Sequence, residues 1–219
     1  TRVRSSAASD VYKRQNLWIA AFNEGLSMID LNKPLIQNYS FPSIREKTGF
    51  ITNIKNIYED GDGDLWIDQN RWGVGIFNPG TNKLQLYTDI PSLKNVPNLR
   101  NISCIISVPL LNEIWLGSEY YPEIYRVKKE KDRIELLGTL NLSNYADNPG
   151  FPRIFYEDSK HNLWVVTTKG ILVKPEKEKN LQDTKFPSMD ITGIGEGKDG
   201  TLWIGTCLLY TSPSPRDRG

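Results

Sequence analysis

The sequence predicts an all-β fold, and two observations carry that prediction. Gly, Pro, Asn and Asp interrupt the chain every few residues, which leaves room for strands of four to six residues but not for long helices. A tryptophan that is flanked by aliphatic residues and preceded by a polar turn also recurs at nearly even intervals, at Trp18, Trp66, Trp115, Trp164 and Trp203. Periods of about 40 to 50 residues are typical of β-propeller blades, each a four-stranded antiparallel sheet.

The second unit illustrates the predicted blade. Its strands are NIKNIYE at 53–59, DLWID at 64–68, VGIFN at 74–78 and KLQLYT at 83–88. The turns between them are rich in Gly, Pro, Asn and Asp, the residues that reverse a chain. We expect a propeller fragment, an open arc of about three complete blades and two partial ones, with the blades at 16–41, 51–89, 102–140, 151–186 and 191–206. The first unit begins at its second strand, and the last stops there.

The recurring tryptophan is predicted to lie on the second strand of each blade. A blade buries both faces against its neighbours, and an indole covers a large area with few torsions. Three residues before the later tryptophans, the hairpin turn needs residues that tolerate positive φ, and these are Gly63, Asn112, His161 and Gly200. His161, the one histidine of the chain, is therefore predicted to be a turn residue and not a metal ligand or a general base.

The stretch DGDGD at 60–64 has two interpretations. Its carboxylates suggest a calcium site formed by Asp60, Asp62 and Asp64, because Ca²⁺ prefers oxygen ligands. The stretch lacks the spacing of the twelve-residue calcium loop and its terminal bidentate Glu. The equivalent turns of the later units are also poor in carboxylates. A plain hairpin turn is therefore the favoured interpretation, and no metal is predicted.

Both ends of the chain are expected to be non-native. Residues 5–15, SSAASDVYKRQ, and residues 207–217, CLLYTSPSPRD, resemble in-frame translations of the transposon adapter DNA used to prepare sequencing libraries. Residues 1–15 and 207–219 are therefore excluded from the fold prediction. Residues 16–206 are expected to be a piece of a longer protein. An incomplete propeller exposes apolar faces and unpaired strand edges, so we expect the isolated fragment to behave poorly in solution.

Composition excludes several classes of function. The two ends hold six of the 27 basic and two of the 26 acidic residues, so residues 16–206 carry 21 basic and 24 acidic residues, a net charge of −3. No basic excess remains for nucleic acid or for an anionic membrane. Cys104 has no partner within 16–206, which excludes a disulfide framework. No apolar run approaches the roughly 18 residues needed to span a bilayer.

The repeats resemble the two-component regulator propeller family. The pattern is Glu-Asp, a Gly-containing turn, Leu-Trp-Ile-Gly-Thr, and then Gly-Leu or Gly-Val. It is matched by IYEDGDGDLWID with GVGIFNPGTNK, FYEDSKHNLWVVTTKGILV, IGEGKDGTLWIGT and NLWIAAFNEGLSMIDLNK, and the resemblance covers essentially all of 16–206. The third unit, ISVPLLNEIWLGSEYYPEIYRV, departs from the pattern because it lacks Glu-Asp before the turn and Gly after the loop.

The resemblance implies a function in signalling. Such repeats typically form ectodomains of membrane-spanning histidine kinases, often hybrids with response-regulator modules, in gut Bacteroidetes. There they sense glycans outside the inner membrane and switch on polysaccharide-utilisation genes. The resemblance therefore implies a small-molecule or oligosaccharide ligand, a periplasmic location, and a membrane-anchored parent protein that forms a homodimer. It implies no cofactor and no catalytic residue in this fragment.

Ligands of propellers generally lie over the loops that join second to third strands and over the connections between blades. Two such loops here are rich in aromatic residues, and their candidate ligand-binding residues are Asn70, Arg71, Trp72, Tyr120 and Tyr121. Aromatic faces beside amide, carboxylate and guanidinium groups suit a pyranose ring. The alternative is that Trp72 packs against its own blade and that the tyrosines cover a blade junction or a partner subunit.

Two other classes of function stay open. A propeller lyase of the streptogramin-inactivating type would require a catalytic histidine on the ligand face, which a missing blade could hold. A protein-interaction scaffold would bind no small ligand. The residues favour a sensor, because they contain no Cys/His pair and no Gly-x-Ser-x-Gly elbow.

Overall fold

A computed structural model describes residues 16–21, 25–30, 36–39, 41, 54–69, 73–131, 133–186 and 190–206. The two ends that are predicted to be non-native lie outside these residues. The chain divides into two compact units, residues 1–87 and residues 88–219. Every strand pairing within the described residues is antiparallel, so the predicted all-β class is confirmed.

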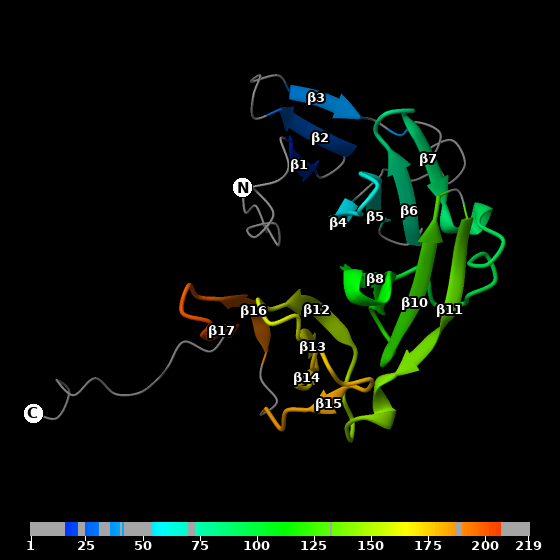
Figure 1. Cartoon of the computed structure of the whole chain (residues 1–219). Helices are drawn as coiled ribbons and strands as arrows, with labels where there is room; N and C mark the ends of the chain where they lie inside the picture. Colours follow the sequence, from blue (N-terminus) through cyan, green and yellow to red (C-terminus); the bar gives the residue numbers. More distant parts are fainter. Residues whose placement is uncertain are drawn as a thin grey trace, which may run out of the picture. The chain divides into compact units, whose positions relative to one another are not determined.

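The first unit contains two sheets, drawn in blue and in cyan to green in Figure 1. One has three strands in the order β1 (Asn16–Ala21), β2 (Gly25–Asp30) and β3 (Ile36–Tyr39). The other has four, β4 (Ile54–Glu59), β5 (Leu65–Gln69), β6 (Gly73–Asn78) and β7 (Lys83–Leu86). The four strands of the predicted second blade are thus present. The fourth ends at Leu86, where a 3-10 turn, Tyr87–Asp89, begins.

The core of the first unit lies between these two sheets. Leu26 from one sheet and Leu65, Ile67 and Phe77 from the other are fully buried in a single cluster. The ring of Phe77 has Tyr39 and Phe41 at centroid distances of 5.0 and 5.1 Å in edge-on geometry. Leu65 and Ile67, which alternate along β5, thus point into this core, while Trp66 and Asp68 between and after them are buried on the other face of the strand.

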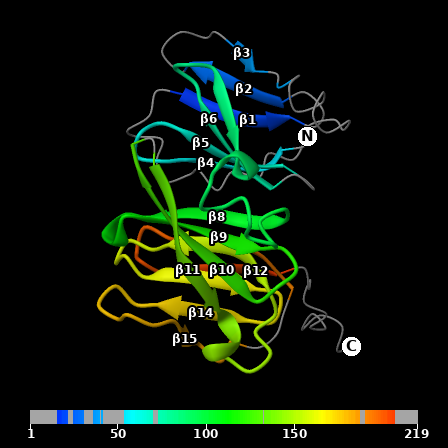
Figure 2. The same ribbon diagram turned by 90° about the vertical axis from the view of Figure 1, so that its right-hand side faces the viewer.

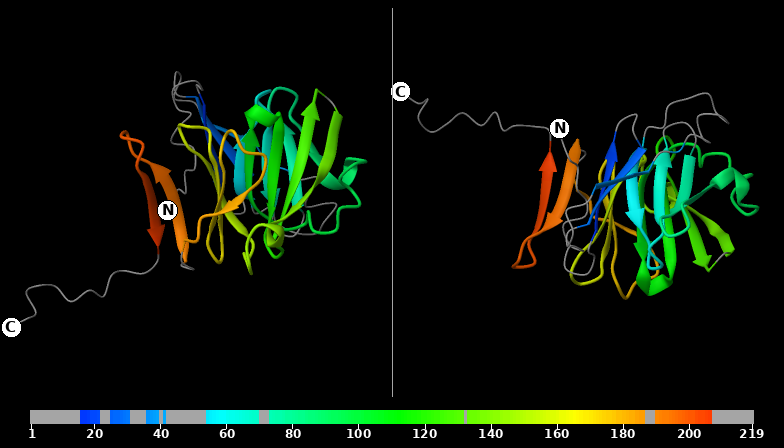
Figure 3. Two further views of the ribbon diagram at one scale, coloured as in Figure 1. Left: turned by 60° about the horizontal axis from the view of Figure 1, so that its bottom comes forward. Right: turned by 90° about the horizontal axis from the view of Figure 1, so that it is seen from above.

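The second unit contains two four-stranded sheets and one hairpin (Figure 2). The first sheet consists of β8 (Ile102–Val108), β9 (Glu113–Ser118), β10 (Glu123–Glu130) and β11 (Arg133–Asn141). The second consists of β12 (Pro152–Glu157), β13 (Leu163–Thr167), β14 (Ile171–Lys174) and β15 (Gln182–Asp183). The hairpin, orange to red in Figure 3, is formed by β16 (Ile191–Glu196) and β17 (Leu202–Thr206).

The two four-stranded sheets of the second unit pack face to face. Ile124 and Val165, one from each sheet, are fully buried in one apolar cluster. Their first strands, β8 and β12, lie against each other, and Ser103 Oγ donates to the Pro152 carbonyl over 2.6 Å. Gly117 has no room for a side chain, because an added Cβ would lie 2.5 Å from Cys104 Sγ and 2.8 Å from Pro152 Cβ. Close sheet packing therefore requires glycine there.

The hairpin turns adopt the backbone that the sequence predicts. Gly63, Asn112, His161 and Gly200 all have positive φ, at 84°, 51°, 60° and 80°. Each lies between the first two described strands of its sheet and three residues before a motif tryptophan. The tryptophans themselves lie on strands, namely β1, β5, β9, β13 and β17. The prediction that His161 is a turn residue is confirmed.

Burial of the tryptophans differs among the sheets. Trp66 and Trp115 are almost completely buried, whereas Trp203, on the last strand, is 68% exposed. Trp18 is half-buried, with its ring 5.7 Å from that of Tyr39. A tryptophan in a two-stranded hairpin thus lacks the cover that complete sheets provide.

Candidate functional site

The candidate ligand site lies at one edge of the sheets of the second unit. We call it the loop edge and define it as residues 89–101, 119–122, 142–151 and 168–170, which include two loops between second and third strands and two connections between sheets. Backbone hydrogen bonds join these segments to one another. Glu119 donates to the Asn101 carbonyl over 2.9 Å, and Leu142 donates to the Pro122 carbonyl over 2.7 Å. These four segments of the second unit are therefore held together.

The loop from residue 119 to residue 122 carries two of the predicted ligand residues. The Tyr120 and Tyr121 side chains are 59% and 48% exposed. Their backbone is held in place: Tyr121 N donates to Ser118 Oγ over 3.3 Å, and Glu123 N donates to the Tyr121 carbonyl over 2.7 Å. A ring on a fixed loop loses little conformational freedom when a ligand binds.

Hydrogen bonds among Asn98, Glu123 and Tyr125 hold the residues next to this loop in place. The Glu123 Oε2 atom accepts hydrogen bonds from Tyr125 Oη over 2.7 Å and from Asn98 Nδ2 over 3.2 Å. Tyr125 is buried, and its burial, together with the adjacent Glu123 carboxylate, raises the pKa of the phenol far above its ordinary value. Tyr125 is therefore a neutral donor at all physiological pH values, and its bond to Glu123 persists.

The other predicted ligand residues, Asn70, Arg71 and Trp72, lie outside the described residues. The structure thus places Tyr120 and Tyr121 at the loop edge and leaves the remainder of the predicted set as a prediction. The sequence analysis did not select Asn98, Glu123 or Tyr125. Their role depends on contacts between segments about 25 residues apart in the sequence, as with Asn98 and Glu123.

The opposite edge of the second unit, which we call the turn edge, contains its hairpin turns before the motif tryptophans, at 109–112, 158–162 and 197–201, and the first unit has an equivalent turn at 60–64. In two of them an aspartate joins the turn to the tryptophan. Asp60 Oδ2 accepts from Trp66 Nε1, and Asp158 Oδ2 accepts from Trp164 Nε1, both over 2.9 Å. The Oδ1 atom of each aspartate accepts from two backbone amides of its own turn. The Asp of the Glu-Asp pattern therefore fixes the turn and gives the indole N–H of the tryptophan a hydrogen-bond acceptor.

The third unit achieves the same result with another residue. Pro109 stands six residues before Trp115, at the place of that aspartate, and Glu113 Oε2 accepts from Trp115 Nε1 over 2.8 Å instead. The Arg126 guanidinium pairs with both oxygens of this buried carboxylate. Burial alone raises the pKa of Glu113, but the bonds from Arg126 and Trp115 outweigh it, so the pKa lies below its ordinary value.

The aspartates of the DGDGD turn have hydrogen-bonding partners within the protein. Both oxygens of Asp60 accept from N–H groups, and Asp64 Oδ1 accepts from Asn78 Nδ2. These carboxylates therefore have hydrogen-bonding roles within the first unit, as a plain hairpin turn would require. Among the residues that the structure describes, no group of three or more His, Cys, Asp or Glu side chains could hold a metal ion.

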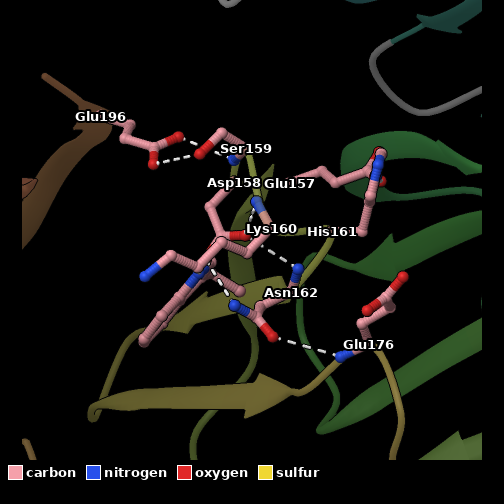
Figure 4. A network of polar contacts seen from close by, with 9 residues as sticks. Glu157, Asp158, Ser159, Lys160, His161, Asn162, Glu176 and Glu196 are labelled. Carbon is pink, nitrogen blue, oxygen red and sulfur yellow. Dashed lines mark hydrogen bonds and ion pairs between the residues drawn. The ribbon is translucent and has the colours of Figure 1, made fainter. Parts of the chain in front are cut away.

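His161 belongs to the same turn edge (Figure 4). Its Nδ1 atom lies 2.8 Å from Glu157 Oε1, and this contact raises the pKa of the exposed imidazole. In the same turn, Ser159 binds the Glu196 carboxylate of the next sheet through its backbone amide and its hydroxyl, each over 2.7 Å. The one histidine of the chain thus lies at the edge opposite the exposed tyrosines.

Within the described part of the chain, no helix is long and apolar enough to span a membrane.

Comparison with known proteins identifies one repeat. Residues 185–207 match the family model of the two component regulator propeller. The resemblance predicted from the sequence is confirmed by this match. A search of curated protein sequences found no significant relative.

Solved structures share the fold. The extracellular domain assigned to the hybrid two component system BT3049 of B. thetaiotaomicron has a TM-score of 0.64 at 16% identity, and the match covers 89% of this chain and 25% of that one. The extracellular domain assigned to the one component system BT4673 of the same organism gives 0.59 at 16% identity, with coverages of 88% and 25%. Virginiamycin B lyase from Staphylococcus aureus gives 0.59 at 21%, with coverages of 86% and 59%. The β-propeller fold is thereby confirmed, and this chain spans about a quarter of the two extracellular domains.

Proposed function

We propose that this chain, which carries a two-component regulator propeller repeat, is part of the extracytoplasmic ligand-sensing propeller of a hybrid sensor histidine kinase. The repeat at 185–207 and the fold shared with extracellular domains of two B. thetaiotaomicron signalling systems support the proposal. The ligand is an oligosaccharide, and the response is the expression of polysaccharide-utilisation genes. The parent protein is a homodimer anchored in the inner membrane, with this part in the periplasm.

The observation that carries the proposal is the pair of exposed rings on a fixed loop. Tyr120 and Tyr121 stand next to each other in a segment that is hydrogen-bonded to both adjoining connections. A pyranose presents apolar C–H faces and a rim of hydroxyls, so an exposed aromatic face with nearby amide and carboxylate groups matches it. Asn70, Arg71 and Trp72, which lie outside the described residues, stay proposed ligand residues on the basis of the sequence alone.

Ligand binding would act on the kinase through a coupling free energy. The ligand must bind one arrangement of the ectodomain more tightly than another, and the difference biases the kinase. Closely packed sheets with buried cores change little by themselves. We therefore expect the change at dimer contacts or at the junction with the next domain.

The test is calorimetric titration of the complete receptor with a panel of oligosaccharides. For whichever sugar binds, Tyr121→Ala and Trp72→Ala are expected to weaken binding by about tenfold each, ~1.4 kcal/mol. Leu110→Ala serves as the control, because Leu110 is 58% exposed but lies in the turn between β8 and β9, at the turn edge. Unchanged affinity in both aromatic variants would contradict the stacking site.

The fold shared with enzymes such as virginiamycin B lyase is the observation in favour of an enzymatic function. A lyase of the streptogramin-inactivating type requires a histidine on the ligand face, and that histidine would have to come from outside the described residues, because His161 is a turn residue at the opposite edge. Sequencing the complete reading frame distinguishes the two functions. A sensor predicts a membrane helix and a kinase module, whereas an enzyme predicts a catalytic cluster in the remaining blades.

A further inference from the structure

We infer that Tyr125 is a positioning residue of the candidate site, because its hydroxyl holds the loop at 119–122 in the arrangement that binds the ligand. Tyr125 is only 2% exposed, so it does not itself touch a sugar. The inference rests on the proposed function, because it concerns the same site. It adds a buried group that sets the affinity of the exposed Tyr120 and Tyr121 rings.

The sheet fixes the position of the Tyr125 ring. Tyr125 lies on β10, where it pairs with Leu116 of β9 on one side and with Thr139 of β11 on the other. A residue between two paired strands moves less than a residue in a loop. Its hydroxyl is therefore a fixed point to which the neighbouring loop can be attached.

Three side chains meet at this hydroxyl. Tyr125 Oη donates to Glu123 Oε2 over 2.7 Å. The Ser118 and Asn98 side chains also hydrogen-bond with it. Burial and Glu123 raise the pKa of the phenol, and the other two bonds act in the opposite direction. Because Ser118 precedes the loop and Glu123 follows it, one hydroxyl joins both ends of the loop, and Asn98 attaches the connection before β8 to the same point.

The same two end residues hold the backbone of Tyr121. Ser118 Oγ accepts from Tyr121 N over 3.3 Å, and Glu123 N donates to the Tyr121 carbonyl over 2.7 Å. The second bond closes a three-residue turn centred on Pro122, whose ring restricts φ. Both backbone contacts of Tyr121 thus depend on residues that the Tyr125 hydroxyl holds. Without that hydroxyl the two residues lose their shared partner, and the loop gains other arrangements.

Loss of this support weakens binding although no contact with the ligand is removed. A loop that is ordered before binding loses little conformational freedom, whereas a loop with several arrangements must first be ordered. The apparent Kd rises in inverse proportion to the fraction of molecules whose loop is in the binding arrangement. If that fraction falls to about one fifth in Tyr125→Phe, the apparent Kd rises about fivefold.

The experiment is calorimetric titration of the complete receptor with gluco-, manno-, xylo-, arabino- and galacturono-oligosaccharides. For whichever sugar binds, Tyr125→Phe, which keeps the buried ring and removes only the hydroxyl, is expected to raise Kd about fivefold. Tyr156→Phe is the matched control, because this half-buried tyrosine has its hydroxyl beside Glu196, near the turn edge. The control also loses a hydrogen-bonded hydroxyl, but its Kd should stay within about twofold.

Further variants separate positioning from a general loss of stability. In the Tyr121→Ala receptor, which lacks the ring that the contacts position, Tyr125→Phe should change Kd by less than about twofold. Glu123→Gln keeps an acceptor for the Tyr125 hydroxyl and should also stay within about twofold, whereas Glu123→Met, of similar length but without this acceptor, should match Tyr125→Phe. Because Glu123 is only half-buried, this pair gives the result even where Tyr125→Phe does not fold.

Hydrogen–deuterium exchange provides a readout that needs no sugar. In the sugar-free receptor, Tyr125→Phe should speed exchange in a peptide that covers residues 118–123 and leave exchange at 158–162 unchanged. Unchanged exchange at 118–123 would overturn the inference.

Two results of the titrations would also overturn it and leave the proposed function intact. One is a Kd for both Tyr125→Phe and Glu123→Met within about twofold of that of the natural receptor. The other is an increase of about fivefold for Tyr125→Phe that persists in the Tyr121→Ala receptor. No binding by any sugar of the panel would instead contradict the proposed function, and the inference with it.

Discussion

Replacing Asp158 by alanine tests the role that the structure gives to the aspartate of the repeat. The carboxylate is almost completely buried and accepts four hydrogen bonds, all of 2.9 Å. Two come from backbone amides of the turn, one from the Asn162 side chain and one from the Trp164 indole. No neighbouring side chain replaces all four when the carboxylate is removed, so we expect Asp158→Ala to be strongly destabilising.

The magnitude follows from these bonds. Loss of a side chain that caps two turn amides costs about 1 kcal/mol, by analogy with helix N-caps. Loss of a charged acceptor for a half-buried indole costs about 2 kcal/mol more. Asp158→Ala should therefore lower the free energy of unfolding by about 3 kcal/mol. Asp158→Asn keeps the shape of the side chain and one acceptor oxygen, but its NH2 group would face two N–H donors, so this variant should lose about 2 kcal/mol.

Urea unfolding, together with the indole N–H resonance of Trp164, measures both effects. Ser159→Ala is the matched control in the same turn, because Ser159 is exposed and its hydroxyl binds only the Glu196 carboxylate in the contacts above. It should cost less than about 1 kcal/mol. A loss below 1 kcal/mol for Asp158→Ala, with an unshifted Trp164 resonance, would refute the reasoning.

Three further predictions concern other residues of the repeat. Gly117→Ala should destabilise the protein by about 3 kcal/mol, because the added Cβ would overlap Cys104 and Pro152, whereas Gly205→Ala, whose added Cβ would have its nearest atom 3.6 Å away, should cost less than about 0.5 kcal/mol in the same urea assay. Glu113→Gln should cost about 2 kcal/mol at pH 7 through its pair with the partly exposed Arg126. The pKa of Glu113 is lowered in the folded state, so the difference in free energy of unfolding between this variant and the wild-type protein should be complete above the ordinary pKa of about 4.3. That difference should vanish as the pH falls through the pKa of Glu113 in the folded protein. A pH-independent difference would show that charge is not the cause. His161→Val should lower the melting temperature while His161→Gly does not, since φ at this position is 60°, and equal melting temperatures for the two variants would exclude backbone strain as the reason.

The sequence predicted those features of the fold that depend on short-range patterns. The four turn residues with positive φ were identifiable because a hairpin before each tryptophan needs one such residue at a fixed spacing. The turns rich in Gly, Pro, Asn and Asp likewise placed the strands of the predicted second blade, β4 to β7. Local backbone requirements are visible in a single sequence because they act within a few residues.

The role of the repeat aspartate was not recognised, although its signal was present. Asp60 and Asp158 both stand six residues before a tryptophan, which a two-residue comparison could have detected. The substitution of Glu113 for this aspartate was harder to foresee. It depends on Arg126, which is brought to Glu113 by the pairing of β9 with β10.

Part of the candidate site was also predictable. Tyr120 and Tyr121 stood out as adjacent aromatic residues in a loop, and the structure shows both rings exposed at the expected edge. Their support by Asn98, Glu123 and Tyr125 was not predictable, because it requires contacts between a connection and a strand that only the folded sheet brings together. The contribution of Asn70, Arg71 and Trp72 stays a prediction.

Hydrogen–deuterium exchange of the complete receptor, with and without a saturating oligosaccharide that it binds, tests the location of the site most directly. The account predicts slower exchange in peptides that cover residues 118–123 and 142–151, at the loop edge. It predicts no change in peptides that cover residues 109–112 and 158–162, at the turn edge. Protection confined to the turn-edge peptides, or unchanged exchange at the loop edge under saturating sugar, would contradict it.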